Sequence, residues 1–379
     1  MLKTLSCSAA LVAVSSMAPA WAATSLGEHV TVSGFGTVGA VRTNSDEGDY
    51  VREAQAVGAT TNASLKVDSN LGLQVTAKAT PWLSATVQSL TAQRTTDELT
   101  SRIEWAFVKV LPAEGLSVRA GKFSLPNFLI SDSRRVGYAN TALRPANEVY
   151  GLDLLNGGLK GLDASYQMPV AGGSLTLTAL GGTSAYTATN ASPIDVQNVR
   201  GLNLVWDHDG YTARIGQVTA KPQLPDSILA LLPPGTNLDE TYKFTGAGFS
   251  VDRDNVVVQA EYVQRRSSQF DAIIGADAWY LLAGYRFGNL LPYVQRADVR
   301  PDRDDNAFVV FGPQTSTALG LRWDAFSSAA IKFQAERVDT HGTRGVSFVT
   351  PAVMTAFGPV AQPVTKPVTT LSVAVDFVF

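Results

Sequence analysis

Charged and aromatic side chains gather in a polar segment that spans residues 123–158. Its densest positive charge is the adjacent pair Arg134 and Arg135. Guanidinium groups along a narrow aqueous path bias which ions enter it, because low-dielectric walls focus their field. The same groups can also be ordinary solvated charges, or tie the segment to its surroundings, and the sequence leaves these interpretations open. The candidate residues of this segment are Asp132, Arg134, Arg135, Tyr138, Arg144 and Glu148.

Motifs for catalysis, cofactors and metals are weak in this chain. His29, His208 and His341 have no metal-ligand spacing and no nucleophile motif beside them. The glycines of residues 34–39 match a dinucleotide fingerprint, but that motif needs a following helix, and a polar segment follows instead. We therefore expect no enzymatic activity, no cofactor and no metal site. Four aspartates between positions 298 and 305 leave cation binding in that segment open.

The first 22 residues have the composition of a signal peptide. Lys3 is followed by an apolar stretch, and Ala20-Trp21-Ala22 supplies a small-x-small cleavage pattern. The only cysteine, Cys7, lies inside this segment, so we expect a mature chain from residue 23 to 379 without disulfides. An exported protein without disulfides needs another source of stability, such as an extensively hydrogen-bonded sheet.

The charge balance points away from nucleic acid as a partner. The chain has 30 basic and 33 acidic residues, a net charge of −3 that becomes about −4 without Lys3, and no basic patch. After residue 22 no apolar run is long enough for a spanning helix. Strands that alternate apolar and polar residues average out in a hydropathy profile, so a membrane barrel passes this test.

Alternation with a period of two recurs along the whole chain. In residues 71–79 and 83–88 the odd positions are apolar on both arms, and the short break at Pro81 forces an antiparallel return. Sixteen such strands are predicted, near residues 30–41, 71–79, 83–88, 103–110, 116–121, 162–166, 175–179, 202–206, 211–215, 247–251, 256–262, 281–287, 291–293, 319–323, 331–335 and 370–379.

The connections between these strands are alternately short and long. Seven are tight turns, and eight are longer and polar, near 42–63, 92–101, 123–158, 181–198, 220–241, 265–275, 299–315 and 339–368. Outer-membrane barrels have short periplasmic turns and long outer loops, whereas a soluble sandwich has no reason to keep its long loops at one end. The sequence thus predicts an all-β fold, a transmembrane antiparallel β-barrel of about sixteen strands.

The hydrocarbon of the membrane requires the barrel to be closed. In hydrocarbon every backbone N–H and C=O must find a partner within the protein, so an open sheet edge is excluded. Sixteen strands enclose an aqueous lumen rather than a packed core. Aromatic residues near the short turns, such as Trp82, Trp206 and Trp323, suit an interfacial girdle.

The last strand resembles the terminal strand of Gram-negative outer-membrane proteins, because apolar residues alternate from Leu371 to a final phenylalanine, Phe379, with Phe377 before it. The order of strands and loops resembles the sixteen-stranded general porins. This resemblance implies recognition of the final residues by the barrel assembly machinery, a third loop folded into the lumen, a homotrimer, and contact with lipopolysaccharide in the outer membrane of a Gram-negative cell.

The side chains that alternate with the apolar positions are predicted to face the lumen. Of the lumen-facing charges, Arg119, Arg214, Arg286 and Arg322 are the candidate selectivity residues of the wall. Together with a loop of mixed charge they predict weak anion preference or little preference. The bases expected to face inward are Lys78, Arg119, Arg214, Arg286, Arg296, Arg322 and Lys332, and the acids are Glu104, Glu261, Asp298, Glu336 and Asp376.

Three functions agree with this pattern. The first is a porin that passes small hydrophilic solutes and ions by passive diffusion. The second is a channel selective for anions, sugars or carboxylates, with a saturable site that Arg134, Arg135 and Tyr138 would form. The third is an outer-membrane enzyme or adhesin that uses its loops, for which the exposed apolar run of residues 228–232 is the pointer.

Overall fold

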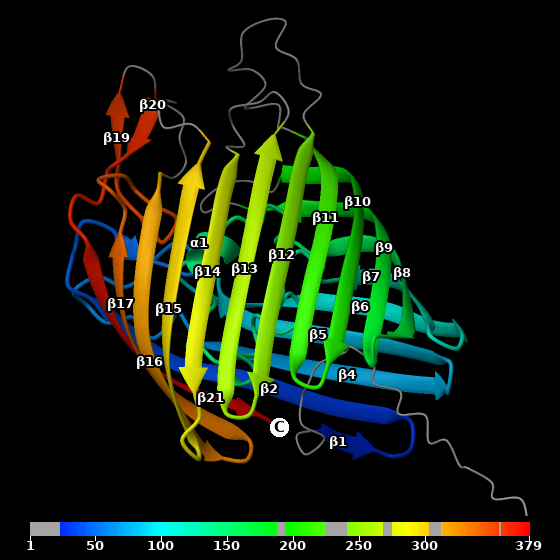
Figure 1. Ribbon diagram of the computed structural model, residues 1–379. Helices are drawn as coiled ribbons and strands as arrows, with labels where there is room; N and C mark the ends of the chain where they lie inside the picture. Colours follow the sequence, from blue (N-terminus) through cyan, green and yellow to red (C-terminus); the bar gives the residue numbers. More distant parts are fainter. Residues whose placement is uncertain (1–22, 188–193, 224–240, 268–274, 303–311, 356–357) are drawn as a thin grey trace, which may run out of the picture.

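The computed structural model describes residues 23–187, 194–223, 241–267, 275–302, 312–355 and 358–379, and one closed antiparallel sheet dominates it (Figure 1). The predicted signal peptide and the apolar run 228–232 lie outside the described residues. The ring consists of β2 (Val30–Thr43), β4 (Asn70–Thr80), β5 (Leu83–Gln93), β6 (Leu99–Ala113), β7 (Leu116–Phe123), β8 (Leu159–Val170), β9 (Gly173–Tyr186), β10 (Ile194–His208), β11 (Tyr211–Gln223), β12 (Tyr242–Arg253), β13 (Val256–Ser267), β14 (Ala276–Tyr285), β15 (Leu290–Pro301), β16 (Gln314–Phe326), β17 (Ala329–Asp339) and β21 (Val368–Val378).

The last strand closes the ring. β21 pairs with β17 on one side and with β2 on the other, and β2 pairs in turn with β4. No strand edge of the ring is therefore left open to lipid, as the hydrocarbon environment requires. The predicted barrel of sixteen antiparallel strands is confirmed. A short strand that was not predicted, β1 (Ala23–Leu26), pairs with the first residues of β2.

Long connections lie at one end of the barrel and short turns at the other (Figure 1). In the first long connection β3 (Asp49–Tyr50) pairs with β18 (Phe348–Val349) of the last one. The last connection also contains a hairpin of β19 (Ala352–Thr355) and β20 (Gly358–Ala361). Among the described residues, no helix has the length and apolar character needed to cross a bilayer.

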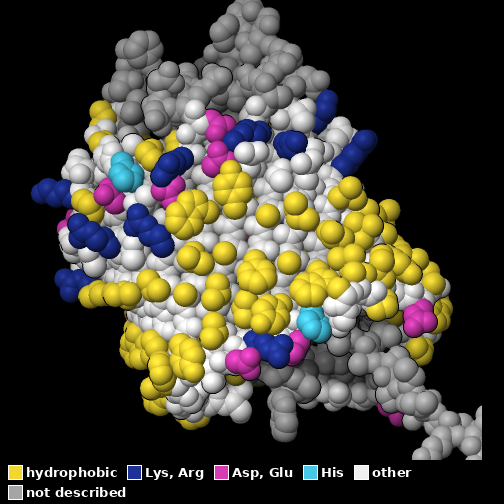
Figure 2. All heavy atoms as spheres, viewed as in Figure 1, with side chains coloured by type: hydrophobic (Ala, Val, Ile, Leu, Met, Phe, Trp, Pro, Cys, Tyr) yellow, Lys and Arg dark blue, Asp and Glu magenta, His cyan; other side chains and the backbone are white. Residues whose placement is uncertain are grey.

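The outer face of the wall is apolar in its middle. Large aliphatic side chains there are exposed because they point away from the barrel, among them Val38 at 63%, Leu162 at 58% and Leu202 at 60%. Figure 2 shows hydrophobic side chains in a band across the middle of the wall on the face in view. Such exposure would be unfavourable in water over this area, whereas it is favourable against lipid. The alternation predicted from the sequence therefore places its apolar residues outward.

The inner face departs from the expectation of a wholly aqueous lumen. On β10–β15 the inward side chains are largely apolar, and the third long connection packs against them in one buried cluster. Phe244 is 1% exposed, Tyr280 3% and Leu282 1%. On this half of the barrel the prediction was wrong, because a loop that folds inward replaces water by apolar contact.

In strand β15 the alternation pattern predicted the wrong orientation of the side chains, because the inner wall is apolar there. Leu291 and Tyr293, predicted to face outward, are buried inside, and Gly284 of β14 pairs with Tyr293. Arg296 pairs with the outward Leu281, so Arg296 and Asp298 lie on the outer face and not in the lumen. Both faces of this strand carry apolar residues near the turn, so alternation alone did not fix its orientation.

The terminal phenylalanines close the seam between the last and first strands. The ring of Phe377 covers Gly36 and that of Phe379 covers Gly34, where an added Cβ would lie 2.5 and 2.2 Å from the ring carbons. The backbone of Phe379 also exchanges two hydrogen bonds with Gly34, at 2.7 and 3.0 Å. The glycines thus provide the space into which the final aromatic side chains pack.

Candidate functional site

The third long connection, residues 124–158 and called loop 3 from here on, runs through the interior of the barrel. It contains a short 3-10 turn, η1 (Gly137–Ala139), and one helical turn, α1 (Asn147–Tyr150), which Figure 1 shows within the ring. All side chains from 140 to 150 are buried. Loop 3 is therefore part of the core, held by contacts from several strands of the wall.

A buried lysine of the wall holds the tip of loop 3. Lys332 on β17 is fully buried, and its Nζ donates to the carbonyl oxygens of Gly137, Asn140 and Ala142 at 2.7, 2.6 and 3.1 Å. The carboxylate of Asp376 on β21 balances the ammonium charge at 3.0 Å. A buried charge needs such partners, so the loop backbone supplies what water would otherwise provide.

Arg322 of β16 holds the same stretch of loop 3. Its Nη1 donates to the carbonyl oxygens of Tyr138 and Asn140, both at 2.8 Å, and its guanidinium lies 5.2 Å from the ring centre of Tyr138. The hydroxyl of Tyr138 donates to the carbonyl of Ser327 in the turn after β16, at 2.8 Å. Tyr138 and Arg322 therefore position the loop at the turn end of the barrel.

The entry of loop 3 is bound to the opposite wall. Arg214 on β11 donates to the carbonyl of Pro126. Glu261 on β13 accepts from the backbone N–H of Leu129 at 2.7 Å and from the hydroxyl of Tyr150 at 2.9 Å. Two charged residues that alternation placed in the lumen thus satisfy polar groups of the loop instead of lining an open path.

Arg144 links loop 3 to the first long connection and to the seam strands. Its guanidinium forms two hydrogen bonds with Asp68 at 2.9 and 2.6 Å, one with the Tyr50 hydroxyl at 3.2 Å and one with Ser372 at 2.8 Å. Glu336 lies 3.5 Å away. The Arg144 side chain is 2% exposed, so it positions the loop and does not meet a passing solute.

Glu148 of α1 is buried without a cation at hydrogen-bond distance. Its Oε1 accepts from Nε2 of Gln314 at 2.7 Å, and its Oε2 has no partner among the described residues. Burial and the nearby carboxylate of Glu336 raise the pKa of Glu148 to about 7. The neutral acid is therefore the form that fits this packed position near neutral pH.

The other half of the wall, strands β4–β8, has a polar and positive row of residues on its inner face. Inward positions of β4–β8 form one register row, which contains Lys78, Lys109, Arg119 and Asp163. Lys78 is exposed and Lys109 half-buried, whereas Arg119 forms hydrogen bonds from both Nε and Nη2 to Asp163, the closest at 2.5 Å. Asp132 of loop 3 is exposed on the facing side and acts electrostatically on Arg119. This half can hold water and ions.

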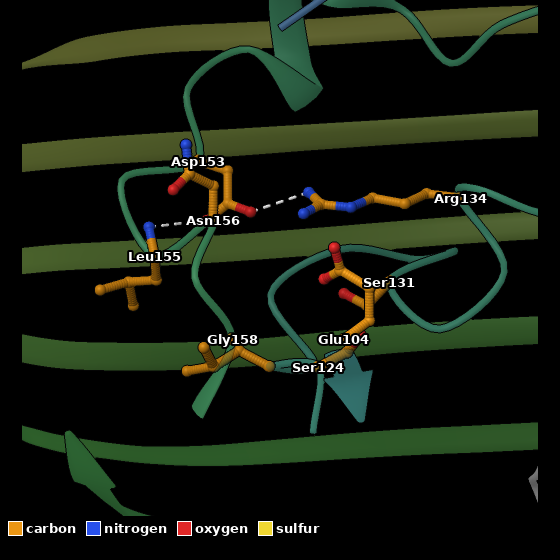
Figure 3. Close-up of a pocket in the computed structure, with 9 residues that line it drawn as sticks. Glu104, Ser124, Ser131, Arg134, Asp153, Leu155, Asn156 and Gly158 are labelled. Carbon is orange, nitrogen blue, oxygen red and sulfur yellow. Dashed lines mark hydrogen bonds and ion pairs between the residues drawn. The ribbon is translucent and has the colours of Figure 1, made fainter. Parts of the chain in front are cut away.

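Charged residues crowd between loop 3, the first connection and β6; we call them the arginine cluster. Arg134 pairs with Asp153 at 2.8 Å, as Figure 3 shows beside Glu104 and Ser131. Arg135 pairs with Glu53, and Glu104 accepts from two further guanidinium groups at 2.7 and 2.9 Å. Five cations face three carboxylates, which leaves net positive charge; the members are Arg52, Arg94, Arg102, Arg134, Arg135, Glu53, Glu104 and Asp153.

The field of this cluster is strong enough to override burial at Glu53. Burial alone would raise the pKa of its carboxyl, but the guanidinium groups of Arg135, Arg134 and Arg52 lower it to about 2. Burial lowers the pKa of Arg135 to about 10 in spite of the attraction of Glu53. Glu53 and Arg135 are therefore both charged at neutral pH.

The structure brings together only part of the predicted set. Arg134 and Arg135 meet in the arginine cluster, but Tyr138 lies with Arg322 and not beside them. Arg286 follows β14 at the turn end and pairs with Asp252. Sequence reasoning missed Arg52, Arg94, Arg102 and Lys109. Lys109 stands between the apolar residues Val108 and Val110, so the same alternation could have identified it as an inward-facing charge.

Groups of metal-binding side chains are absent from the described residues: no three His, Cys, Asp or Glu side chains there could hold an ion together. Two of the four aspartates between 298 and 305, Asp304 and Asp305, lie outside those residues.

Comparisons with known proteins agree with the fold. No family model and no curated protein matches the chain in sequence. Among solved structures, OmpF of Salmonella typhi in complex with daunomycin is 13% identical, with 92% of this chain and 97% of that chain covered and a TM-score of 0.58. An anion-selective porin from Comamonas acidovorans is 16% identical, with 92% and 99% covered and a TM-score of 0.57.

OmpT, an outer-membrane protein of Vibrio cholerae, is 10% identical, with 93% of this chain and 98% of that chain covered and a TM-score of 0.56. At these identities the likeness concerns the fold alone. The chain has the fold of porin-like antiparallel β-barrels.

Proposed function

We propose that this protein is a porin through which small hydrophilic solutes and ions diffuse passively across the outer membrane. The path runs along the inner face of β4–β8, between the wall and loop 3. The observation that carries the proposal is the contrast between the two halves of the lumen. Loop 3 fills the apolar half, whereas Lys78, Lys109 and Asp132 of the other half are exposed or half-buried.

Weak anion preference is part of the proposal. The arginine cluster has more cations than carboxylates, and the row of Lys78 and Lys109 adds positive charge below it. Positive groups along a water-filled path raise the local concentration of anions. The anion selectivity named for the Comamonas acidovorans porin belongs to that protein, and it accords with the charge found here.

Swelling of liposomes in sugar solutions tests passive diffusion. We expect vesicles that contain the protein to swell in small sugars and progressively less in larger ones. Ser84 faces inward and Ala85 outward on β5, so Ser84→Trp should slow swelling and Ala85→Trp should not. Vesicles that do not swell with the folded wild-type protein would exclude the diffusion pore, and equal effects of both variants would exclude the path along β4–β8.

A channel with a saturable anion site is the second candidate. For this site we propose Arg94, Arg102 and Arg135 in place of the predicted trio Arg134, Arg135 and Tyr138, because Tyr138 lies with Arg322. Current that falls as the concentration of one organic anion rises would favour this candidate, and current that grows in proportion would favour the general porin.

We propose no catalytic role for the chain. At the loop end Nδ1 of His341 lies 3.8 Å from the Asp339 carboxylate and Nε2 lies 3.5 Å from the Thr315 hydroxyl, and we interpret this group as a loop contact. We further propose assembly by the barrel assembly machinery, a homotrimer and contact with lipopolysaccharide. Three equal conductance steps per insertion would support the trimer, and single steps would contradict it.

A further inference from the structure

Two arginines flank a threonine on the outer wall near its loop end. Thr317 of β16 pairs in register with Arg296 of β15 and with Arg337 of β17. All three residues have the outward parity of Leu319, which is 64% exposed. Two strand spacings separate the arginine backbones by about 10 Å, so their long side chains can converge above Thr317.

These two guanidinium groups have no carboxylate partner among the described residues. Arg296 donates from Nη1 to the hydroxyl of Thr317 at 2.6 Å, and both arginine side chains are exposed. The nearest outward carboxylates are engaged elsewhere: Asp298 pairs with Arg300 at 2.9 Å, and Asp339 faces His341. The site thus presents uncompensated positive charge beside a hydroxyl group.

Arg266, an arginine of the same outward band, is paired with carboxylates. Arg266 of β13 lies 2.9 Å from Asp277 and 3.3 Å from Asp302. Figure 2 shows charged side chains of both signs gathered above the apolar band of the wall. The pair Arg296 and Arg337 therefore differs from Arg266 by its lack of an acidic partner.

The wall directly below this pair is apolar. One register step toward the turn end, the row contains Val294, Leu319, Ala335 and Leu371. Leu319 is 64% exposed and Leu371 62%. A ligand bound here would have an anionic group beside the arginines and hydrocarbon on the leucines, which is the chemistry of a membrane lipid.

We propose that Arg296, Thr317 and Arg337 bind the phosphate group of an anionic membrane lipid whose acyl chains lie on Leu319 and Leu371. Guanidinium groups form paired hydrogen bonds with phosphate oxygens, and these bonds are strong where lipid excludes water. The threonine hydroxyl orients Arg296 and can donate to a further phosphate oxygen. The site holds lipid on the outer wall and is independent of the permeation path.

Native mass spectrometry of the detergent-solubilised full chain tests the site. The probes are phosphatidic acid, which has a phosphomonoester, and phosphatidylcholine with the same acyl chains. We expect the wild-type protein to retain phosphatidic acid about tenfold more strongly than phosphatidylcholine, and Arg296→Gln/Arg337→Gln to lose that preference. Arg266→Gln is the matched control, since its charge is already paired, and it should keep the preference.

Two further arms separate the sources of the signal. Inorganic phosphate at millimolar concentration should not displace the lipid, because it lacks the chains that contact the leucines; displacement would mean a free-anion site. Loss of the preference in Arg266→Gln as well would mean nonspecific charge attraction, and retention of the preference in the double variant would overturn the proposal. If the double glutamine variant folds poorly, Arg296→Lys/Arg337→Lys takes its place. It keeps the positive charge but loses the paired hydrogen bonds, so we expect it to retain only part of the preference.

Discussion

The ammonium group of Lys332 on β17 lies 2.7 Å from the carbonyl oxygen of Gly137 at the tip of loop 3. Two residues 195 positions apart in the chain are thereby joined inside the barrel. The lysine also satisfies two further carbonyl groups of the loop and is neutralised by Asp376. We infer that this contact, together with Arg322, keeps loop 3 inside the lumen.

Replacement of this lysine should release the loop tip. Lys332→Met removes three hydrogen bonds and leaves Asp376 buried without its cation, so we expect a loss of about 3–5 kcal/mol in the free energy of unfolding. Loop 3 should also become accessible to protease, and single-channel current should become noisy. Denaturant unfolding and limited proteolysis measure these effects.

Lys78→Met is the control, because Lys78 is exposed on the inner wall. It should change the unfolding free energy by less than about 0.5 kcal/mol. Adding Asp376→Asn to Lys332→Met should recover part of the loss, since no charge then remains buried without a partner. Equal stability of Lys332→Met and Lys78→Met would contradict the anchor.

The packing of α1 should weaken as pH rises. The pKa of Glu148 in the folded protein is about 7, above its ordinary value of 4.5, so folding favours the protonated acid. The stabilisation is complete below pH 4.5 and is lost as pH rises through 7, by an amount on the order of 1–3 kcal/mol. Proteolysis of loop 3 between pH 5 and 8 should therefore accelerate with pH.

Glu148→Gln keeps the hydrogen-bonding shape without the charge. Its loop should be cleaved at a rate that depends less steeply on pH than that of the wild type, after correction for the protease with an unfolded substrate. A wild-type loop whose cleavage slows as pH rises would show that another group controls it.

The seam between β2 and β21 should tolerate no side chain at Gly34. A Cβ there would lie 2.2 Å from Cζ of Phe379, so Gly34→Ala must displace the terminal ring. We expect slower folding into detergent or lipid and a loss of about 1–3 kcal/mol. Gel mobility with and without heating measures the folded fraction.

Phe379→Leu alone should have a smaller effect on folding, and it should restore folding when combined with Gly34→Ala, because the shorter side chain leaves space for the new methyl group. If Gly34→Ala folds as fast as the wild type, packing of the ring on the glycine is not what closes the seam.

The sequence predicted the strands well because each strand has one face on lipid. Leu71, Leu162 and Leu202 are exposed outward as the period of two requires. The exception is β15, where Leu291 and Tyr293 face inward against loop 3. Where both faces of a strand are apolar, alternation does not indicate which one meets lipid.

Loop contacts were less accessible to sequence reasoning. The path of loop 3 was expected from the porin resemblance, and no local pattern specifies it. Arg144 finds its partner Asp68 76 positions away and Ser372 228 positions away, so its burial depends on closure of the whole barrel. A charge in a polar segment looks solvated until the elements around it are placed.

The most direct test of the proposed channel is the reversal potential of purified protein in a planar bilayer under a KCl gradient. We expect open channels and a potential shifted modestly toward the equilibrium potential of chloride. Arg135→Glu should move it toward that of potassium, because one cation of the arginine cluster becomes an anion. A folded protein without conductance, or a wild-type channel with strong cation selectivity, would contradict the account.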